Sequence, residues 1–172
     1  LPIELTAKIP SNKKLLTYVG NLGIAQDQTV LIGLIKEMKI LDNFHFLLIG
    51  QKNIDRENIY GAKKKHNLEN LTILDSIDQK YVNSICTMSY VGIFTLDKRH
   101  TTHNIPGKFL QYLSCGLPVF GICGDGDIVD IISKNGFGKT YLGNNPKDAQ
   151  SSLKKLINEI ENNYIESKHL KN

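Results

Sequence analysis

Residues 44–50 read FHFLLIG. This stretch is a nearly unbroken apolar run of strand length that ends at Gly50, which is typical of a strand covered on both faces by helices. The flanking segments fit this interpretation. Residues 27–41 place their apolar side chains on one face of a helix, and residues 56–66 have the composition of a polar helix. The stretch therefore predicts a helix, a buried strand and a second helix in succession.

The same alternation of strands and helices continues over most of the chain. The expected strands are residues 15–19, 44–49, 71–74, 90–95, 118–122 and 138–142. The expected helices are residues 27–41, 56–66, 78–88 and 107–115, a segment that opens at 125–127 and closes at 135–136, and a last helix that starts at 145–146. In the fifth helix we expect four buried side chains, Ile128, Val129, Ile131 and Ile132. Six strands alternating with six helices predict a doubly wound α/β domain, a six-stranded parallel sheet with helices on both faces, because parallel neighbours need crossover connections.

The composition is that of a globular domain that buries a substantial core. The chain has 172 residues, of which 41% are hydrophobic and 22% charged, and this excludes the disordered and fibrous classes. Its net charge is +4, and the densest basic spot, Lys63–Lys65, is interpreted as a solvated helix face. No apolar stretch is long enough to span a bilayer, and the first residues show no signal-peptide pattern. The three cysteines fit no zinc spacing, so we expect reduced thiols in a cytoplasmic protein.

The domain organisation follows from these elements. Residues 1–14 are expected to be a lead-in, residues 15–161 the α/β domain, and residues 162–172 a polar tail. The first residue is Leu1 rather than Met, so we expect the chain to be part of a longer protein.

Ligands of a doubly wound domain bind outside the carboxyl ends of the strands, so the loops that follow strands are the ones to inspect. The first is Gly20-Asn21-Leu22-Gly23, where glycines let the backbone approach a ligand and the next helix offers N–H groups to an anion. It is neither a complete GxGxxG motif nor a P-loop, so phosphate binding and a packing turn both stay open. Gly50-Gln51-Lys52 follows the second strand without an acidic residue, which argues against a dinucleotide dehydrogenase.

The loop after the fourth strand, residues 96–106, carries more chemistry. Lys108 stands at the start of the following helix, where a point charge and oriented backbone N–H groups together predict a diphosphate cradle. His100 and His103 have no carboxylate-rich partner set nearby in the sequence, so we expect no metal there. Residues 125–127, Asp-Gly-Asp, are interpreted as a turn before a helix rather than a cation loop. The chain has no GxSxG or HExxH motif that would indicate a self-sufficient hydrolase.

Three segments taken together resemble a known family. They are YVGNLGIAQ at residues 18–26, FLLIG at residues 46–50 and IPGKFLQYLSCGLPV at residues 105–119. Their order and spacing, over about residues 15–161, resemble the C-terminal domain of GT-B fold glycosyltransferases, and most closely glycosyltransferase family 4, the group 1 transferases of bacterial surface polysaccharide synthesis. The resemblance implies that this Rossmann-like half of a GT-B fold holds the nucleotide sugar. It also implies a missing N-terminal domain, to which residues 1–14 lead.

The resemblance assigns donor-binding residues position by position. The glycine loop would face the diphosphate through Gly20, Asn21, Gly23 and Gln26, while Gly50 and Lys52 would border the nucleotide. The turn after the third strand would hold the base through Ser76 and Ile77, and the helix start at Pro106, Gly107 and Lys108 would contact the phosphates.

Two positions depart from the family pattern. Family members commonly carry two glutamates a fixed distance apart, and the matching positions here are His103 and Gln111. The resemblance implies that Gln111 contacts the donor ribose, and that His103 lies near the sugar and acts with Lys108 as a catalytic residue. An amide can bind a ribose diol, although it lacks the charge-assisted hydrogen bond that a carboxylate gives.

The function implied is the donor-binding domain of a retaining glycosyltransferase of the hexosyltransferase type. It would serve transfer from a UDP- or GDP-sugar to a growing surface glycan, of the lipopolysaccharide or capsule type, without a metal or other cofactor. We expect this part alone to be inactive. The alternatives are a nucleotide-sugar epimerase of the same fold and a non-catalytic nucleotide-binding module. The expected partners are the nucleotide-sugar donor, the N-terminal acceptor domain and a glycan or lipid-linked acceptor. We also expect peripheral contact with the inner face of the cytoplasmic membrane through the full-length protein, and no nucleic acid.

Overall fold

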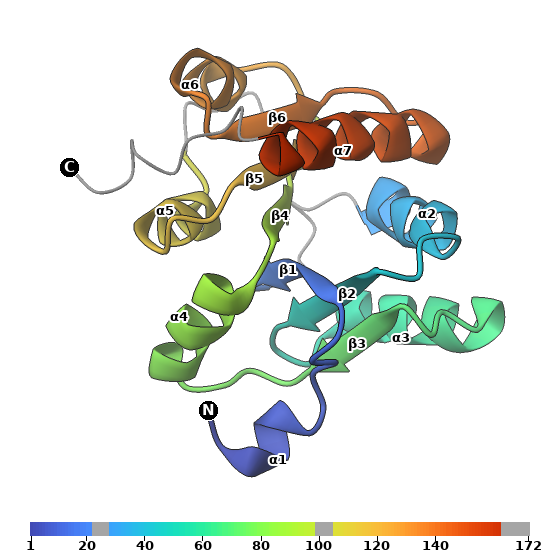
Figure 1. Ribbon diagram of the computed structural model, residues 1–172. Helices are drawn as coiled ribbons and strands as arrows, with labels where there is room; N and C mark the ends of the chain where they lie inside the picture. Colours follow the sequence, from blue (N-terminus) through green and yellow to red (C-terminus); the bar gives the residue numbers. More distant parts are fainter. Residues whose placement is uncertain (22–27, 99–104, 163–172) are drawn as a thin grey trace.

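The computed structural model describes residues 1–21, 28–98 and 105–162, which form one six-stranded sheet (Figure 1). The strands are β1 (Lys14–Val19), β2 (Phe44–Ile49), β3 (Leu71–Leu74), β4 (Val91–Thr95), β5 (Val119–Ile122) and β6 (Gly138–Tyr141). Their order in the sheet is β3-β2-β1-β4-β5-β6, and every neighbouring pair is parallel. The chain builds outward from β1 to β3, then returns to the other side of β1 and builds outward to β6. This is the predicted doubly wound parallel sheet, with its switch point between β1 and β4.

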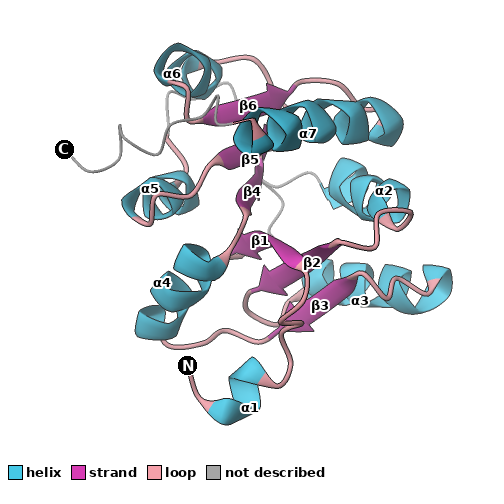
Figure 2. Ribbon diagram, in the orientation of Figure 1, coloured by secondary structure: helices cyan, strands magenta, loops and turns pink. Residues whose placement is uncertain are grey.

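Helices cover both faces of the sheet, as predicted (Figure 2). They are α1 (Ile3–Thr6), α2 (Gln28–Met38), α3 (Ile54–His66), α4 (Gln79–Met88), α5 (Gly107–Ser114), α6 (Asp127–Asn135) and α7 (Pro146–Glu161). Helices α2, α3 and α7 cover one face, and α4, α5 and α6 cover the other. No helix within the three described ranges is both long and apolar enough to cross a membrane.

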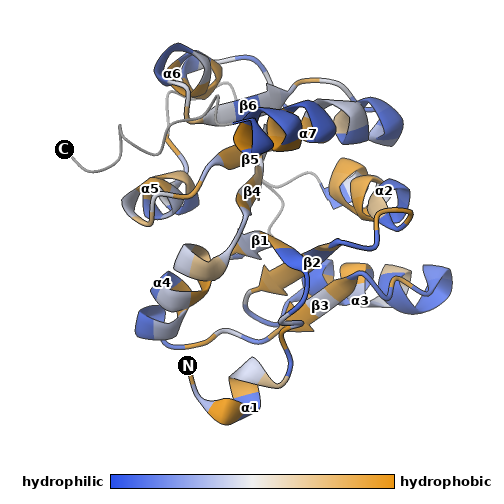
Figure 3. Ribbon diagram, in the orientation of Figure 1, coloured by the Kyte–Doolittle hydropathy of each residue, from blue (hydrophilic) through white to orange (hydrophobic). Residues whose placement is uncertain are grey.

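Each face of the sheet has its own hydrophobic core. Because side chains alternate along a strand, Leu16 and Tyr18 of β1 join the core under α2 and α7, while Leu15 and Val19 join the core under α4 and α5. Figure 3 shows apolar residues along β4 and β5, and both apolar and polar sides on α2 and α7. The stretch at residues 44–49 is buried at every position, which explains its nearly unbroken apolar sequence.

The predicted element bounds agree with the structure to within a few residues, with two differences. Helix α1 lies in the lead-in and was not predicted, because its 4 residues are too few to show a helical period. In α6, Val129 and Ile131 pack against the core but are only partly buried, so the expectation that they are buried was wrong. Only Ile128 and Ile132, which are one helical turn apart, are buried. The polar tail lies outside the described residues from 163 onward.

Helices α2 and α7 pack together where the last helix begins. A Cβ atom at Gly33 of α2 would overlap the ring of Pro146, the first residue of α7. Asn145 caps this helix, its side chain accepting a hydrogen bond from Lys147 N at 3.0 Å. The predicted start of the last helix at 145–146 is therefore confirmed, with Asn145 as its N-cap, and the proline ring also serves as a helix–helix contact.

The hydroxyl of Tyr112 bridges β1 and β4 at the switch point. It accepts a hydrogen bond from Val19 N of β1 at 2.9 Å and donates one to the carbonyl oxygen of Ile93 of β4, also at 2.9 Å. The ladder between these strands reaches the pair Tyr18 and Ile93, so the Tyr112 hydroxyl continues it where the strands part. Gly92 makes room for the ring, since a Cβ there would lie 2.5 Å from Tyr112 Cγ.

The ends of β1 and β2 approach each other closely at two glycines. Gly20 has a φ of +113°, which favours glycine, and its N–H donates to the carbonyl oxygen of Ile49 at 2.8 Å. A Cβ at Gly50 would lie 2.5 Å from the carbonyl oxygen of Gly20. Glycine at position 50 is therefore required by the backbone of the neighbouring loop, whatever the ligand.

We predict that Gly50→Ala lowers the free energy of unfolding by about 1–3 kcal/mol, because the added methyl group must displace backbone atoms. Gly61→Ala is the matched control. Gly61 lies inside α3, and no atom lies within 4 Å of the position that a methyl group would take there, so alanine should raise stability by about 0.5–1 kcal/mol. Urea unfolding of both variants measures the difference, and equal stability of Gly50→Ala and the wild type would show that the loop gives way freely.

Candidate functional site

A hollow of about 290 Å³ lies at the carboxyl ends of β1, β2 and β3, where a doubly wound sheet binds its ligands. It is lined by Val19, Gly20, Asn21, Ile49, Gly50, Gln51, Ser76, Ile77, Gln79 and Val82. Five residues that the family resemblance assigned to the donor therefore line one cavity, although they come from three separate loops. These five are Gly20, Asn21, Gly50, Ser76 and Ile77.

The loop that carries Ser76 is held by an ion pair with a buried arginine. Arg56 of α3 has a side chain only 9% exposed, and its Nη2 lies 2.7 Å from Asp75 Oδ1. Asp75 directly precedes Ser76, so this pair fixes the third wall of the hollow against α3. Sequence reasoning missed Arg56, because an arginine in a polar helix resembles any solvated residue.

Lys52, which is expected to border the nucleotide, is not among the residues that line the hollow. Its side chain is 72% exposed, and its Nζ lies 3.8 Å from Asp75 Oδ2. A contact between Lys52 and a nucleotide therefore stays a prediction.

Lys108 lies beside the hollow, at the first turn of α5. Its Nζ donates a hydrogen bond to the Tyr18 hydroxyl and lies 4.0 Å from the centroid of the Tyr18 ring. A Cβ at Gly20 would be 3.5 Å from Lys108 Cε, so the lysine and the glycine loop are in contact range. Burial lowers the pKa of Lys108 to about 7. An anion placed next to this amine would favour its charged form.

The N-terminus of α5, next to Lys108, is a second feature that suits an anion. Pro106 occupies the N-cap and gives no side-chain cap, so among the described residues no side chain caps the backbone N–H groups at Gly107 and Lys108. Nothing lies within 4 Å of a Cβ position at Gly107. Open helix N–H groups next to a lysine form a setting that suits a phosphate.

Gln111 lies one turn further along α5 and does not line the hollow. Its Nε2 donates to Asn83 Oδ1 of α4 at 3.1 Å, and the same oxygen accepts a hydrogen bond from Gln79 Nε2 at 3.3 Å. Gln79 does line the hollow, so a row of amides runs from the cavity to Gln111. Sequence reasoning missed Gln79 and Asn83, although two amides four residues apart on a helix are a recognisable pair.

Three predicted site residues, Gly23, Gln26 and His103, lie outside the described residues, as does His100. Within residues 1–21, 28–98 and 105–162 there is no group of three or more His, Cys, Asp or Glu side chains that could hold a metal ion.

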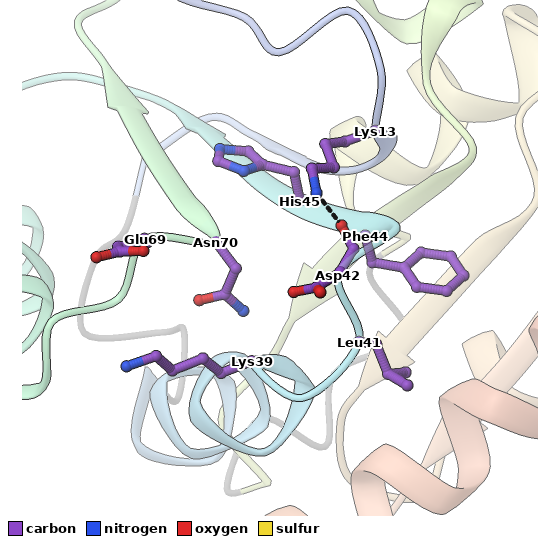
Figure 4. A pocket seen from close by; sticks show the side chains of 8 residues that line it. All are labelled: Lys13, Lys39, Leu41, Asp42, Phe44, His45, Glu69 and Asn70. Atoms are coloured by element: carbon purple, nitrogen blue, oxygen red, sulfur yellow. Dashed lines mark hydrogen bonds between the residues drawn. The ribbon is translucent and has the colours of Figure 1, made fainter.

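A second hollow, of about 330 Å³, lies at the opposite edge of the sheet (Figure 4). Lys13, Lys39, Asp42 and Glu69 supply mixed charges, and Lys13 Nζ donates to the carbonyl oxygen of Asp42. This cavity is larger than the first one, but it lies at the amino ends of β1 to β3, away from every residue that the resemblance assigned. We therefore place the candidate site at the carboxyl edge.

His45 forms a buried part of the wall of this second hollow (Figure 4). Its Nε2 lies 2.9 Å from Thr72 Oγ1. Burial, helped by the charges of Lys63 and Lys13, lowers the pKa of His45 to about 4.

Comparison with known proteins identifies a family. The family model described as glycosyl transferases group 1 matches residues 5–172. No curated protein matches the chain.

Solved structures share the fold at low sequence identity. WaaG, a glycosyltransferase involved in lipopolysaccharide biosynthesis, matches with a TM-score of 0.69 and 14% identity, over 92% of this chain and 41% of that one. A glycosyltransferase from Rickettsia africae matches with a TM-score of 0.68 and 16% identity, over 93% and 43%. The C-terminal domain of LpcC, a group 1 family glycosyl transferase from Francisella tularensis, matches with a TM-score of 0.68 and 14% identity, over 95% and 84%. The chain thus spans less than half of the first two proteins and most of the isolated domain.

We predict that His45 makes folding stability fall as the pH is lowered from 6.5 to 4. An unfolded histidine titrates near 6.5, so in this window the unfolded chain binds the extra proton and is favoured. With the pKa of His45 lowered from 6.5 to about 4, the loss over this window is on the order of 3 kcal/mol.

His45→Gln should remove this part of the pH dependence, whereas His66→Gln, at the end of α3, should leave most of it in place. Urea unfolding at pH 4, 5, 6 and 7 measures it. Parallel curves for the wild type and His45→Gln would show that other groups cause the loss.

Proposed function

Because the chain belongs to the group 1 glycosyl transferases, we propose that it is the donor-binding domain of such an enzyme and holds a nucleoside-diphosphate sugar at the carboxyl edge of its sheet. The observation that carries this proposal is the convergence of Gly20, Ser76 and Lys108 on one edge. The loops after β1, β2 and β3 enclose a hollow, and the lysine and helix N-terminus of α5 lie next to it.

The shape of the site supports separate positions for the base, the diphosphate and the ribose of the donor. The base would enter the hollow, between the loop after β2 and the Ser76–Ile77 turn. The diphosphate would lie over Gly20 and meet Lys108 and the start of α5. The ribose would then lie near the amide row that ends at Gln111, through Gln79 or through Gln111 itself.

The chemistry of glycosyl transfer fits these groups. When the bond between the sugar and the diphosphate breaks, negative charge grows on the leaving diphosphate oxygens. A fixed ammonium group and fixed backbone N–H groups stabilise that charge without rearranging, and this lowers the barrier. These groups offset part of the diphosphate charge, and we propose that transfer needs no metal ion.

The rest of the reaction belongs to a longer protein. WaaG and the Rickettsia africae enzyme are both more than twice the length that this chain covers, which supports an N-terminal domain that brings the acceptor and the remaining catalytic groups. We propose a retaining hexosyl transfer from a UDP- or GDP-sugar to a bacterial surface glycan, of the lipopolysaccharide or capsule type, at the cytoplasmic face of the membrane. The involvement of WaaG in lipopolysaccharide biosynthesis supports this choice of acceptor.

We predict that this chain binds UDP or GDP without a divalent cation, and that Lys108→Ala weakens binding about tenfold to a hundredfold, the effect expected of a charged hydrogen bond. Isothermal titration calorimetry at pH 6.5, with and without EDTA, measures both affinities. Lys134→Ala is the control, because Lys134 pairs with Asp130 on the exposed side of α6 and should not matter. Binding that survives Lys108→Ala unchanged would remove Lys108 from the site.

The pH dependence of binding follows from the same lysine. With the pKa of Lys108 lowered to about 7, half of the free protein lacks the ammonium charge at that pH, and the diphosphate binds the charged form. We predict that affinity falls as the pH rises above 7, by up to about tenfold per pH unit, and that binding at pH 8 takes up close to one proton. Calorimetry at pH 8 in buffers with different ionisation enthalpies counts the protons. Lys108→Ala should take up none, and proton uptake by that variant would assign the effect to another group.

A further inference from the structure

The Tyr18 side chain joins the lysine of the site to its glycine loop. Tyr18 lies on β1, is 1% exposed, and sits directly below the switch point. Its hydroxyl accepts a hydrogen bond from Lys108 Nζ and donates one to the carbonyl oxygen of Asn21 at 3.1 Å. Lys108, which the proposed function places on the diphosphate, and Asn21, which follows Gly20, are therefore both bonded to one buried oxygen.

The ring of Tyr18 contributes separately from its hydroxyl. Lys108 Nζ lies 4.0 Å from the ring centroid, a distance at which a cation is attracted to the face of an aromatic ring. An ammonium group has three N–H donors, and Tyr18 takes one of them. Among the residues that the structure describes, no other acceptor is recorded for Lys108 Nζ, so its remaining donors can serve oxygens that arrive over Gly20.

We propose that Tyr18 is the positioning residue of the diphosphate site, which holds the charged amine of Lys108 beside the glycine loop before the donor arrives. This inference rests on the proposed function of the same edge of the sheet. Tyr18 does not touch the donor itself, because it is buried beneath the loop. It acts through Lys108 and through the Asn21 carbonyl.

Among the described residues, Tyr18 is the polar side chain that accepts a hydrogen bond from Lys108. Burial lowers the pKa of Lys108 and raises that of Tyr18, so the tyrosine stays a neutral acceptor. Within the described ranges, Tyr112 of α5 and Thr95 of β4 are the polar groups near Tyr18. In the part of the chain that the structure describes, no carboxylate pairs with Lys108. Removing the Tyr18 hydroxyl should therefore make the amine harder to protonate.

Tyr18→Phe is the test, because it keeps the ring and removes only the hydroxyl. The expected result is a shift of the pH profile of UDP or GDP binding, measured by calorimetry from pH 6 to pH 9. The midpoint should fall by about one pH unit, with about a tenfold loss of affinity at pH 8 and little change at pH 6. A merely structural defect would weaken binding equally at every pH.

Tyr90→Phe is the matched control. Lys14 Nζ lies 4.6 Å from the centroid of the Tyr90 ring, so this is a second lysine–tyrosine pair, at the amino edge of the sheet. Its loss should leave the pH profile unchanged. A Tyr18→Phe profile that superimposes on that of the wild type would overturn the proposal.

A second measurement needs no ligand, so it separates this proposal from the proposed function. The Lys108 ¹³Cε resonance, identified by its absence in Lys108→Ala, is titrated in the free wild type and in free Tyr18→Phe. We expect its midpoint to fall by about one pH unit in the variant. Equal midpoints would overturn the positioning role even if nucleotides bind, and failure of UDP and GDP to bind would overturn the proposed function alone. If Tyr18→Phe does not fold, nuclear Overhauser contacts between Lys108 Hε and the Tyr18 ring in the wild type decide, and their absence overturns the proposal.

Discussion

The arrangement of this molecule depends on one hydroxyl group placed where two parallel strands part. Beyond Tyr18 and Ile93 the backbones of β1 and β4 no longer bond to each other, and Tyr112 satisfies an N–H of one and a carbonyl of the other. A buried backbone group left without a partner costs about 1–3 kcal/mol, so the bridge both closes the sheet and fixes the width of its opening. Because Tyr112 lies on α5, the same contact fixes the helix whose first turn carries Lys108.

Several separate contacts hold the loops of the candidate site in place. Two glycines bring the backbone close, an ion pair with a buried arginine anchors the loop after β3, and an uncapped helix start lies beside a lysine. The charge of Lys108 is the property that burial changes most. Burying an amine is unfavourable for its charged form, so the folded chain holds Lys108 in a state that an incoming anion improves. Under the proposed function, binding free energy is then gained where the leaving group carries its charge.

The sequence predicted the fold almost completely, because the fold depends on local patterns of apolar residues and on helix-start signals that a single sequence shows. Buried strands such as residues 44–49 are apolar throughout, and helices such as α7 announce their start with Asn145 and Pro146. The site was predictable only as far as its loops. Tyr18, Arg56 and Tyr112 are absent from that prediction because their roles come from partners 90, 19 and 93 residues away, and nothing local distinguishes them from core or surface residues. Lys108 was found because a helix start and a charge coincide in the sequence itself.

The contact between Gly33 and Pro146 has a consequence for how these two positions vary among relatives. Residue 33 has no space for a side chain as long as α7 starts with a proline ring in that position. A larger residue at 33 would require a smaller or displaced residue at 146, so these two positions should vary together among relatives that keep both helices. Helix α2 leads directly out of the segment that follows the glycine loop. Covariation at this joint would therefore record selection on how closely α2 and α7 pack.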